Sequence, residues 1–372
     1  MHGVREVAAD PGARRRRPCG RRDPHVLLRG AQILFIGSYG HGIALARPDP
    51  ASGLPMRTEP AADTPDPSYL ALSPDGRFLY AANALDAGAV SAFAVEGDGV
   101  LRPLGSRSTH GSNPCHVHVR PDGRHVLSAN YKSGSVAVHP VAPDGSLGEA
   151  SDVVRHTGAG PDPERQDGPH AHQVVSDPAG RFVLAVDLGA DAVFTYTLDS
   201  GKLTPAGEAR WRPGAGPRHL AFHPSGRVAY VSDELDSTVT ACAYDPERGR
   251  LTRQRIVPAV PEAGGQPGAG AERNYPSEVL VSADGRFVYV ANRGRDCVAW
   301  FAADDELTPL GSAPCGGRWP RHIAFGRDGR LLHVANQHSD NLATLHVRDD
   351  GSLTPAGPAA STGTPTMVLP AG

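Results

Sequence analysis

The turn Arg120-Pro121-Asp122-Gly123-Arg124 separates two short segments with apolar alternation, CHVHV at 115–119 and HVLSAN at 125–130. An Asp-Gly pair between two such segments is typical of a β-hairpin, because glycine tolerates the positive φ that a tight turn requires. We therefore expect a two-residue hairpin turn at Asp122 and Gly123. The same pattern recurs, with small variations, at 73–77, 177–181, 223–227, 282–286 and 326–330.

Each copy of the turn has the same surroundings. A short segment opened by proline precedes it, as in PRHLAF at 217–222, and an alternating strand follows it, as in FVYVAN at 287–292. A third strand comes after a polar corner, as in GSVAV at 134–138, and a fourth, more polar strand often begins with Leu-Thr-Pro, as at 203–205. We label these strands A to D, from the central channel outward. Four antiparallel strands without helical periodicity form the blade of a β-propeller, and the unit recurs about every 45 to 60 residues.

The two ends of the chain supply one further blade. ILFIG at 33–37 resembles a strand B with no strand A before it, and PTMVL at 365–369 resembles a strand A after which the chain stops. Sharing a blade between the termini would close the ring and leave no sheet edge exposed. The sequence therefore predicts an all-β, seven-bladed propeller over residues 31–372, with the last blade shared. Residues 1–30 are rich in arginine, and we expect them to form a disordered extension.

Composition restricts the partners and the location. The net charge of −3 favours neither a nucleic-acid partner nor a membrane surface, and no run of 18 apolar residues exists to cross a membrane. The five cysteines are scattered and show no CxxC spacing, which indicates reduced thiols in the cytoplasm rather than disulfides or a zinc site. No apolar segment long enough for an export signal follows the arginines of the extension. We expect a monomer, because ring closure leaves no edge strand to pair.

Ionisable residues recur at the start of strand A, where the strands converge on the channel mouth. They are His116, His172, Arg218, His219, Arg321 and His322. In the third blade, counting from the turn glycine places His172 level with Arg218 and His170 just before it. Such residues at converging strand starts predict a pocket for an anionic small molecule. Any single histidine could instead satisfy backbone groups, but Arg218 and Arg321 need counter-charges or an anionic ligand.

The end of strand B carries a recurring Asn or Asp, which we interpret as structural because Asx side chains cap turns. The next residue varies, and Glu234 and Arg293 stand out there. Asp233, Glu234 and Asp236 form either a solvated acidic corner or a calcium cluster. They lack the DxDxDG spacing of a calcium loop. We therefore expect no metal and no cofactor.

Four segments carry a resemblance to a known family: GPRHLAFHPSG at 216–226, SDELDS at 232–237, PHAH at 169–172 and ANYKSGSV at 129–136. The chain resembles, from about Ile33 to Leu369, the bacterial 6-phosphogluconolactonase family of seven-bladed propellers, which also includes fungal muconate lactonizing enzymes. The resemblance implies a site formed by a histidine, two arginines and a glutamate. Matched to this sequence, they are His172, Arg218, Glu234 and Arg293, with His170 as the alternative histidine.

The resemblance implies hydrolysis of a sugar lactone, in the best case 6-phosphoglucono-1,5-lactone of the pentose phosphate pathway. Glu234 or His172 would act as general base on water, and Arg218 and Arg293 would stabilise the developing negative charge. We expect Arg321 with His322 to bind the phosphate, and His116, His170 and His219 to contribute further substrate contacts. Two alternatives stay open: a cycloisomerase of the muconate type, and a non-enzymatic binding platform. The low aromatic content of 6% favours the pocket over a binding rim.

Overall fold

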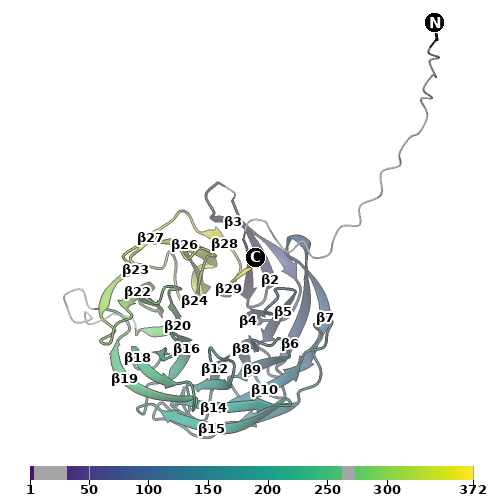
Figure 1. Ribbon diagram of the computed structural model, residues 1–372. Coiled ribbons are helices and arrows are strands. Elements are labelled where there is room, and N and C mark those ends of the chain that lie inside the picture. The colour runs from purple at the N-terminus through teal and green to yellow at the C-terminus, as the bar shows by residue number, and fades with distance from the viewer. Residues whose placement is uncertain (4–31, 50, 262–272, 372) are drawn as a thin grey trace.

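Strands form seven separate sheets arranged in a ring around a central axis (Figure 1). The computed structural model describes residues 1–3, 32–49, 51–261 and 273–371. These residues contain no α-helix, and none of their helical turns is long and apolar enough to cross a membrane. The prediction of an all-β, seven-bladed propeller is confirmed. The extension predicted at 1–30 lies, apart from its first three residues, outside the described residues.

The blades are numbered here in chain order, starting at β4. Blade 1 contains β4 (Pro67–Leu72), β5 (Phe78–Asn83), β6 (Ala89–Glu96) and β7 (Val100–Ser108), with a 3-10 turn η1 (Gly97–Gly99). Blade 2 contains β8 (Pro114–Val119), β9 (His125–Asn130), β10 (Ser135–Pro140) and β11 (Asp152–Arg155). Blade 3 contains β12 (Ala171–Ser176), β13 (Phe182–Asp187), β14 (Ala192–Asp199) and β15 (Lys202–Arg210). Blade 4 contains β16 (Pro217–Phe222), β17 (Val228–Asp233), β18 (Thr238–Asp245) and β19 (Arg250–Pro258).

The remaining blades complete the ring. Blade 5 contains β20 (Tyr275–Val281), β21 (Phe287–Arg293), β22 (Cys297–Ala302) and β23 (Pro309–Pro314). Blade 6 contains β24 (Pro320–Phe325), β25 (Leu331–Asn336), η2 (Gln337–Ser339), β26 (Asn341–Val347), β27 (Leu353–Pro355) and β28 (Ala360–Ser361). Blade 7 contains β29 (Pro365–Ala371), β1 (Ile33–Ser38), β2 (Gly42–Pro48) and β3 (Pro55–Ala62).

Blade 7 joins the two ends of the described propeller. Strand β29 supplies its innermost strand and pairs antiparallel with β1, with Val368 opposite Ile36. Figure 1 shows the C-terminus inside the ring beside the first strands of the chain. The predicted shared blade is therefore present, and it closes the ring by backbone hydrogen bonds.

The hairpin between strands A and B differs from the two-residue turn that we predicted. Five residues, 73–77 in blade 1, connect β4 to β5, and the Ser73 amide donates to the Phe78 carbonyl across them at 2.8 Å. Gly76 has φ +70°, whereas Asp75 does not adopt a positive φ. A two-residue type I′ turn needs positive φ at both central residues. Pro74 instead sets the negative φ that favours an ordinary type I turn, and the glycine ends it.

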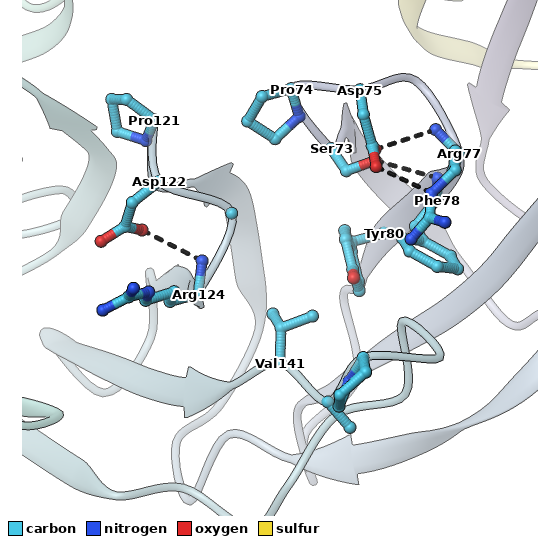
Figure 2. A pocket seen from close by; sticks show the side chains of 13 residues that line it. Ser73, Pro74, Asp75, Arg77, Phe78, Tyr80, Pro121, Asp122, Arg124 and Val141 are labelled. Atoms are coloured by element: carbon cyan, nitrogen blue, oxygen red, sulfur yellow. Dashed lines mark hydrogen bonds and ion pairs between the residues drawn. The ribbon is translucent and has the colours of Figure 1, made fainter.

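The aspartates of these turns hold the loop together rather than form a site. Asp75 accepts hydrogen bonds from the Ser73 hydroxyl at 2.6 Å and from the Arg77 amide at 3.2 Å, and Asp122 accepts one from the Arg124 amide at 3.0 Å (Figure 2). The cavity of about 340 Å³ between these two turns lies at the ends of the strands that face away from the strand-A starts. Its polar side chains are thus largely occupied in turn contacts.

The apolar core lies between neighbouring sheets. Tyr289 and Val298 of blade 5, for example, pack with Ile323 and Val334 of blade 6, and the four are less than 1% exposed. Burial of such residues is the dominant favourable contribution to folding. Because each blade buries its faces against both neighbours, the strand starts at the channel are held in fixed positions.

A β-bulge opens strand A in each blade. In blade 4, Pro217 lies opposite Asp233 and His219 opposite Ser232, so Arg218 is the extra residue, and a register shift occurs at the corresponding place in the other six. A bulge sets two residues against one on the partner strand. The extra residue of each blade and the residue after it form two tiers around the ring. The outer tier contains Ser68, Cys115, His172, Arg218, Ser277, Arg321 and Thr366; the inner tier contains Tyr69, His116, Gln173, His219, Glu278, His322 and Met367.

Candidate active site

A cavity of about 290 Å³ lies where the strand-A starts of blades 2 to 6 meet the ends of their B strands. Four of its lining residues belong to the outer tier and three follow or end a strand B. The remaining two come from loops. The lining residues are Asn113, Cys115, Tyr131, Arg165, His172, Arg218, Glu234, Arg293 and Arg321.

Glu234 occupies the centre of a cluster of arginines. Its Oε2 lies 2.6 Å from Arg293 Nη2 and 2.9 Å from Arg218 Nε, and its Oε1 lies 2.6 Å from Arg165 Nη2. The Glu234, Arg218 and Arg293 side chains are 3%, 3% and 7% exposed. The contact with Arg218 is an ion pair without hydrogen-bond geometry, and Arg218 Nε and Nη1 have no hydrogen-bond partner. Arg218 therefore has buried N–H groups at the cavity wall that donate to no acceptor among the described residues.

The charges in this cluster fix the protonation states. Burial acts to raise the pKa of Glu234, but Arg293, Arg165 and Arg218 outweigh it and hold that pKa well below its ordinary value. Burial lowers the pKa of Arg218 to about 9, so this guanidinium stays cationic at neutral pH. The lining therefore carries four cationic arginines and one ionised carboxylate, an excess of positive charge that favours an anionic ligand.

His172 lies in the outer tier, level with Arg218 as the turn register predicted. Burial, and after it the charge of Arg218, lowers the pKa of His172 well below the ordinary histidine value, so the ring is neutral at pH 7. Its Nδ1 is buried without a hydrogen-bond partner. Since only Nδ1 is both buried and unpaired, Nε2 is the ring nitrogen that can meet a water molecule in the cavity. The neighbouring Cys115 thiol is a poor nucleophile, because burial raises its pKa to about 12.

Arg321 closes the blade 6 side of the cavity. Its Nη2 donates to the Tyr39 hydroxyl at 2.9 Å and its Nη1 to Gln337 Oε1 at 3.2 Å, and its guanidinium lies 5.2 Å from the centre of the Tyr39 ring. These partners are neutral. Arg321 is thus oriented, but it forms no ion pair with any carboxylate among the described residues.

The inner tier lies below the cavity and forms a network of its own. His219 Nδ1 lies 2.9 Å and His322 Nε2 3.3 Å from Glu278 Oε2. The His116 ring lies 4.1 Å from the Tyr69 ring and 5.5 Å from the His219 ring. None of the three histidines lines the cavity. Their predicted role as substrate contacts stays a prediction, since the structure places them one layer deeper than Arg218 and Arg321.

His170, the alternative to His172, has a different environment. Its ring stacks on Tyr131 at 4.6 Å, its Nδ1 lies 3.0 Å from the Tyr131 carbonyl, and its amide donates to Asp187 Oδ1 at 2.7 Å. It does not line the cavity. The geometry therefore favours His172 over His170 as the histidine of the site.

The acidic corner after β17 does not form a cation site. Asp233 Oδ2 accepts hydrogen bonds from Thr240 and Thr238, Glu234 is held by arginines, and Asp236 pairs with Arg212. No group of three or more His, Cys, Asp or Glu side chains in the described part of the chain is arranged to hold a metal ion.

Sequence reasoning missed Arg165 and Tyr131. Tyr131 follows the strand-B asparagine of blade 2, the same register position as Glu234 in blade 4, so that position could have indicated it. Arg165 lies in the connection between β11 and β12, outside the repeating unit. No periodic signal marks it.

Comparison with known proteins agrees with this architecture. Residues 33–370 match the family described as "Lactonase, 7-bladed beta-propeller". The chain belongs to this lactonase family. A 6-phosphogluconolactonase of Bacillus subtilis is 40% identical over 266 residues, which are 70% of this chain and 74% of the relative.

Solved structures resemble the lactonase over nearly its full length. The periplasmic gluconolactonase of Pseudomonas aeruginosa has a TM-score of 0.84 and 32% identity, covering 92% of this chain and 99% of the other. A protein from Lactobacillus plantarum has a TM-score of 0.85 and 30% identity, with 92% and 99% covered. The predicted family and enzyme class are confirmed: this protein is a lactone-hydrolysing enzyme, which removes the non-enzymatic platform from the alternatives.

Proposed function

We propose that the lactonase hydrolyses 6-phosphoglucono-1,5-lactone to 6-phosphogluconate. The observation that carries this proposal is the excess of arginine over carboxylate in the cavity lining. A neutral lactone would not need four guanidinium groups, whereas a phosphorylated one brings a dianion that they can bind. The names of the Bacillus subtilis and Pseudomonas aeruginosa relatives support a gluconolactone as the ring to be opened.

The phosphate would bind at Arg321. Arg321 is partly buried, and the only hydrogen-bond partners of its guanidinium in the described chain are a tyrosine hydroxyl and an amide oxygen, so it has no counter-charge there. An incoming phosphate would supply the missing charge. His322, which the sequence grouped with Arg321, instead contacts Glu278 in the inner tier.

His172 would serve as the general base. Its neutral ring can accept a proton from water at Nε2 as the water oxygen attacks the lactone carbonyl carbon. The negative charge that develops on the carbonyl oxygen would be stabilised by Arg218, whose buried N–H groups lack partners, and by Arg293. When the ring C–O bond breaks, the proton on His172 passes to the departing ring oxygen and gives the hydroxyl of the open acid.

Glu234 is the less suitable base, although the sequence left both residues open. Arginines contact both of its oxygens, and they lower its pKa by stabilising its ionised form. Both oxygens of this carboxylate are thus engaged, whereas Nε2 of His172 has no partner among the described residues and faces the cavity. Its proposed role is to orient Arg218 and Arg293 toward the substrate.

An experiment on Arg321 tests the substrate. Arg321→Ala should lower kcat/KM for the phosphorylated lactone at least about tenfold and leave the rate with unphosphorylated gluconolactone unchanged, as measured by pH-stat. Arg318→Ala is the matched control, because Arg318 is exposed in the same segment and does not line the cavity. Equal losses with both lactones would contradict a phosphate contact at Arg321.

The location and assembly state are part of the same proposal. We propose a cytoplasmic monomer acting on a small anionic lactone, with no nucleic-acid or membrane partner. The four described cysteines are free and buried, which suits a reducing compartment, and the shared blade leaves no strand edge at the junction. Cell fractionation and light scattering test this proposal, and a periplasmic or dimeric protein would contradict it.

A further inference from the structure

The connection between β11 and β12, residues 156–170, is here called the strap. One buried carboxylate fastens both of its ends. Asp187 Oδ2 lies 2.6 Å from His156 Nδ1, and Asp187 Oδ1 accepts the His170 amide at 2.7 Å. The His156 and Asp187 side chains are fully buried. Both ends of the strap are therefore fixed at Asp187, the last residue of β13 in blade 3.

The middle of the strap is fastened as well. Gln166 is fully buried, and its Nε2 donates to the Leu188 carbonyl at 2.9 Å. Its amide donates to the Asp162 carbonyl at 2.7 Å, and its own carbonyl accepts the Gly160 amide at 3.0 Å. Gly160 packs so closely on the Gln166 side chain that a Cβ there would overlap it. The backbone next to Arg165 is thus fixed in position by the hydrogen bonds of Gln166.

The strap places the Arg165 side chain across the cavity. Its Nη2 lies 2.6 Å from Glu234 Oε1, and its Nη2 and Nε lie 3.2 Å and 3.3 Å from the Tyr131 hydroxyl. The Arg165 side chain is 33% exposed, compared with 3% for Arg218 and 7% for Arg293. Arg165 therefore forms the outer, solvent-facing member of the cluster around Glu234.

We propose that Arg165 is a specificity-determining residue whose guanidinium leaves Glu234 to bind an oxyanion of the ligand. Glu234 keeps two buried arginine partners when Arg165 moves, so the exchange leaves no carboxylate unpaired. A planar guanidinium on an exposed side chain can bind phosphate or carboxylate in the same bidentate manner. The oxyanion is either the phosphate of the substrate or the carboxylate formed by hydrolysis. This inference rests on the proposed function only for the class of ligand.

Binding measurements distinguish the two oxyanions. Isothermal titration of the wild type and of Arg165→Ala would use three stable probes: 6-phosphogluconate, gluconate and glucose 6-phosphate. We expect Arg165→Ala to weaken 6-phosphogluconate binding at least about tenfold, the typical effect of a lost charged hydrogen bond. A matching loss with glucose 6-phosphate assigns the phosphate, and a matching loss with gluconate assigns the carboxylate. Arg165→Lys should retain part of the affinity.

Glu164→Ala is the matched control, because Glu164 is the exposed neighbour on the same strap, and it should bind every probe as the wild type does. Circular dichroism and thermal melting would verify the fold of each variant, with Arg165→Gln as a second substitution. Unchanged affinity of Arg165→Ala or Arg165→Gln for all three probes would overturn the inference, as would a wild type that binds none of them. A wild type that binds 6-phosphogluconate but does not hydrolyse its lactone would contradict the proposed function alone.

Discussion

Glu234 Oε2 lies 2.6 Å from Arg293 Nη2, and the two residues come from adjacent blades of the propeller. Glu234 follows β17 and Arg293 ends β21, so the pair joins blades 4 and 5 at the channel mouth. Arg218, from β16, contacts the same carboxylate. One buried negative charge thus holds two buried cations in place, and its removal should affect both activity and stability.

Glu234→Gln should reduce lactonase turnover at least about tenfold, because Arg218 and Arg293 lose the group that orients them. It should also lower the free energy of unfolding by about 3–5 kcal/mol, since two buried cations are left without their counter-charge. Added inorganic phosphate should raise the melting temperature of this variant more than that of the wild type. Thermal melting with and without phosphate measures the loss of stability and its recovery on phosphate binding.

Glu149→Gln provides the control for this substitution. Glu149 forms an exposed ion pair with Arg107 at 3.2 Å, and such pairs contribute no more than about 1 kcal/mol. Wild-type turnover in Glu234→Gln would discard its assigned role.

His172→Asn should lower kcat by about 10² to 10⁴ with little change in KM, the usual effect of removing a general base. The pH dependence gives a second test. Because burial and Arg218 hold the pKa of His172 well below 6.5, kcat/KM of the wild type with glucono-1,5-lactone, which has no phosphate to titrate near pH 6, should be constant from about pH 6 to pH 8. A pH-stat profile, with spontaneous hydrolysis subtracted, measures it. A midpoint at or above 6.5 would contradict the lowered pKa of His172, and near-full activity of His172→Asn would return the base role to Glu234.

The fold could be predicted from the sequence because it repeats. The proline, the turn glycine and the apolar alternation are local signals that the six complete blades carry, and the turn register alone placed His172 level with Arg218. The turn type could not be predicted from Asp-Gly alone. The five-residue connection occurs with a proline before the aspartate, as at 73–77, and without one, as at 282–286, so the turn type depends on how the backbone pairs across it.

The candidate site was predictable only where it follows the repeat. Arg218, Glu234 and Arg293 occupy repeat positions and line the cavity. His116, His219 and His322 also occupy repeat positions, but the bulge that separates them from the cavity depends on backbone pairing and leaves no mark in the sequence. Arg165 reaches Glu234 from a strap whose shape depends on tertiary contacts with Asp187 and Leu188.

The inner tier should make the protein less stable in acid. Burial lowers the pKa of His322 from 6.5 to about 4, and the pKa of His116 and His219 is lowered in the same way. Below pH 6.5 the unfolded chain therefore binds protons that the folded chain does not, and stability falls as the pH drops toward 4. With its pKa near 4, His322 contributes about 2 kcal/mol of this loss between pH 7 and pH 5.

Denaturant unfolding at pH 5 and pH 7 measures this loss. His322→Asn should make the difference between the two pH values smaller, whereas substitution of the exposed His338 should not change it. An equal difference in wild type and His322→Asn would contradict a neutral, buried His322.

Asp233→Asn should stabilise the protein at alkaline pH. Burial raises the pKa of Asp233 from 3.8 to about 8, and its Oδ1 has no hydrogen-bond partner. The folded chain therefore keeps a proton that the unfolded chain releases, and stability falls as the pH rises from about 4 to about 8. Asn occupies the equivalent position in four blades, at Asn83, Asn130, Asn292 and Asn336.

The gain from Asp233→Asn should be at least about 1 kcal/mol at pH 8 and close to zero at pH 4. Melting curves at the two pH values provide the comparison within one variant. A variant that is destabilised equally at both pH values would show that the carboxylate is required for packing.

The arginine excess of the cavity makes the preference for a charged lactone the central claim. Initial rates of the wild type with 6-phosphoglucono-1,5-lactone and with glucono-1,5-lactone, measured by pH-stat at the same ionic strength, give the two values of kcat/KM. A ratio of at least about 10² in favour of the phosphorylated lactone is predicted, because the phosphate makes charged hydrogen bonds with Arg321. Equal values for the two lactones would contradict it.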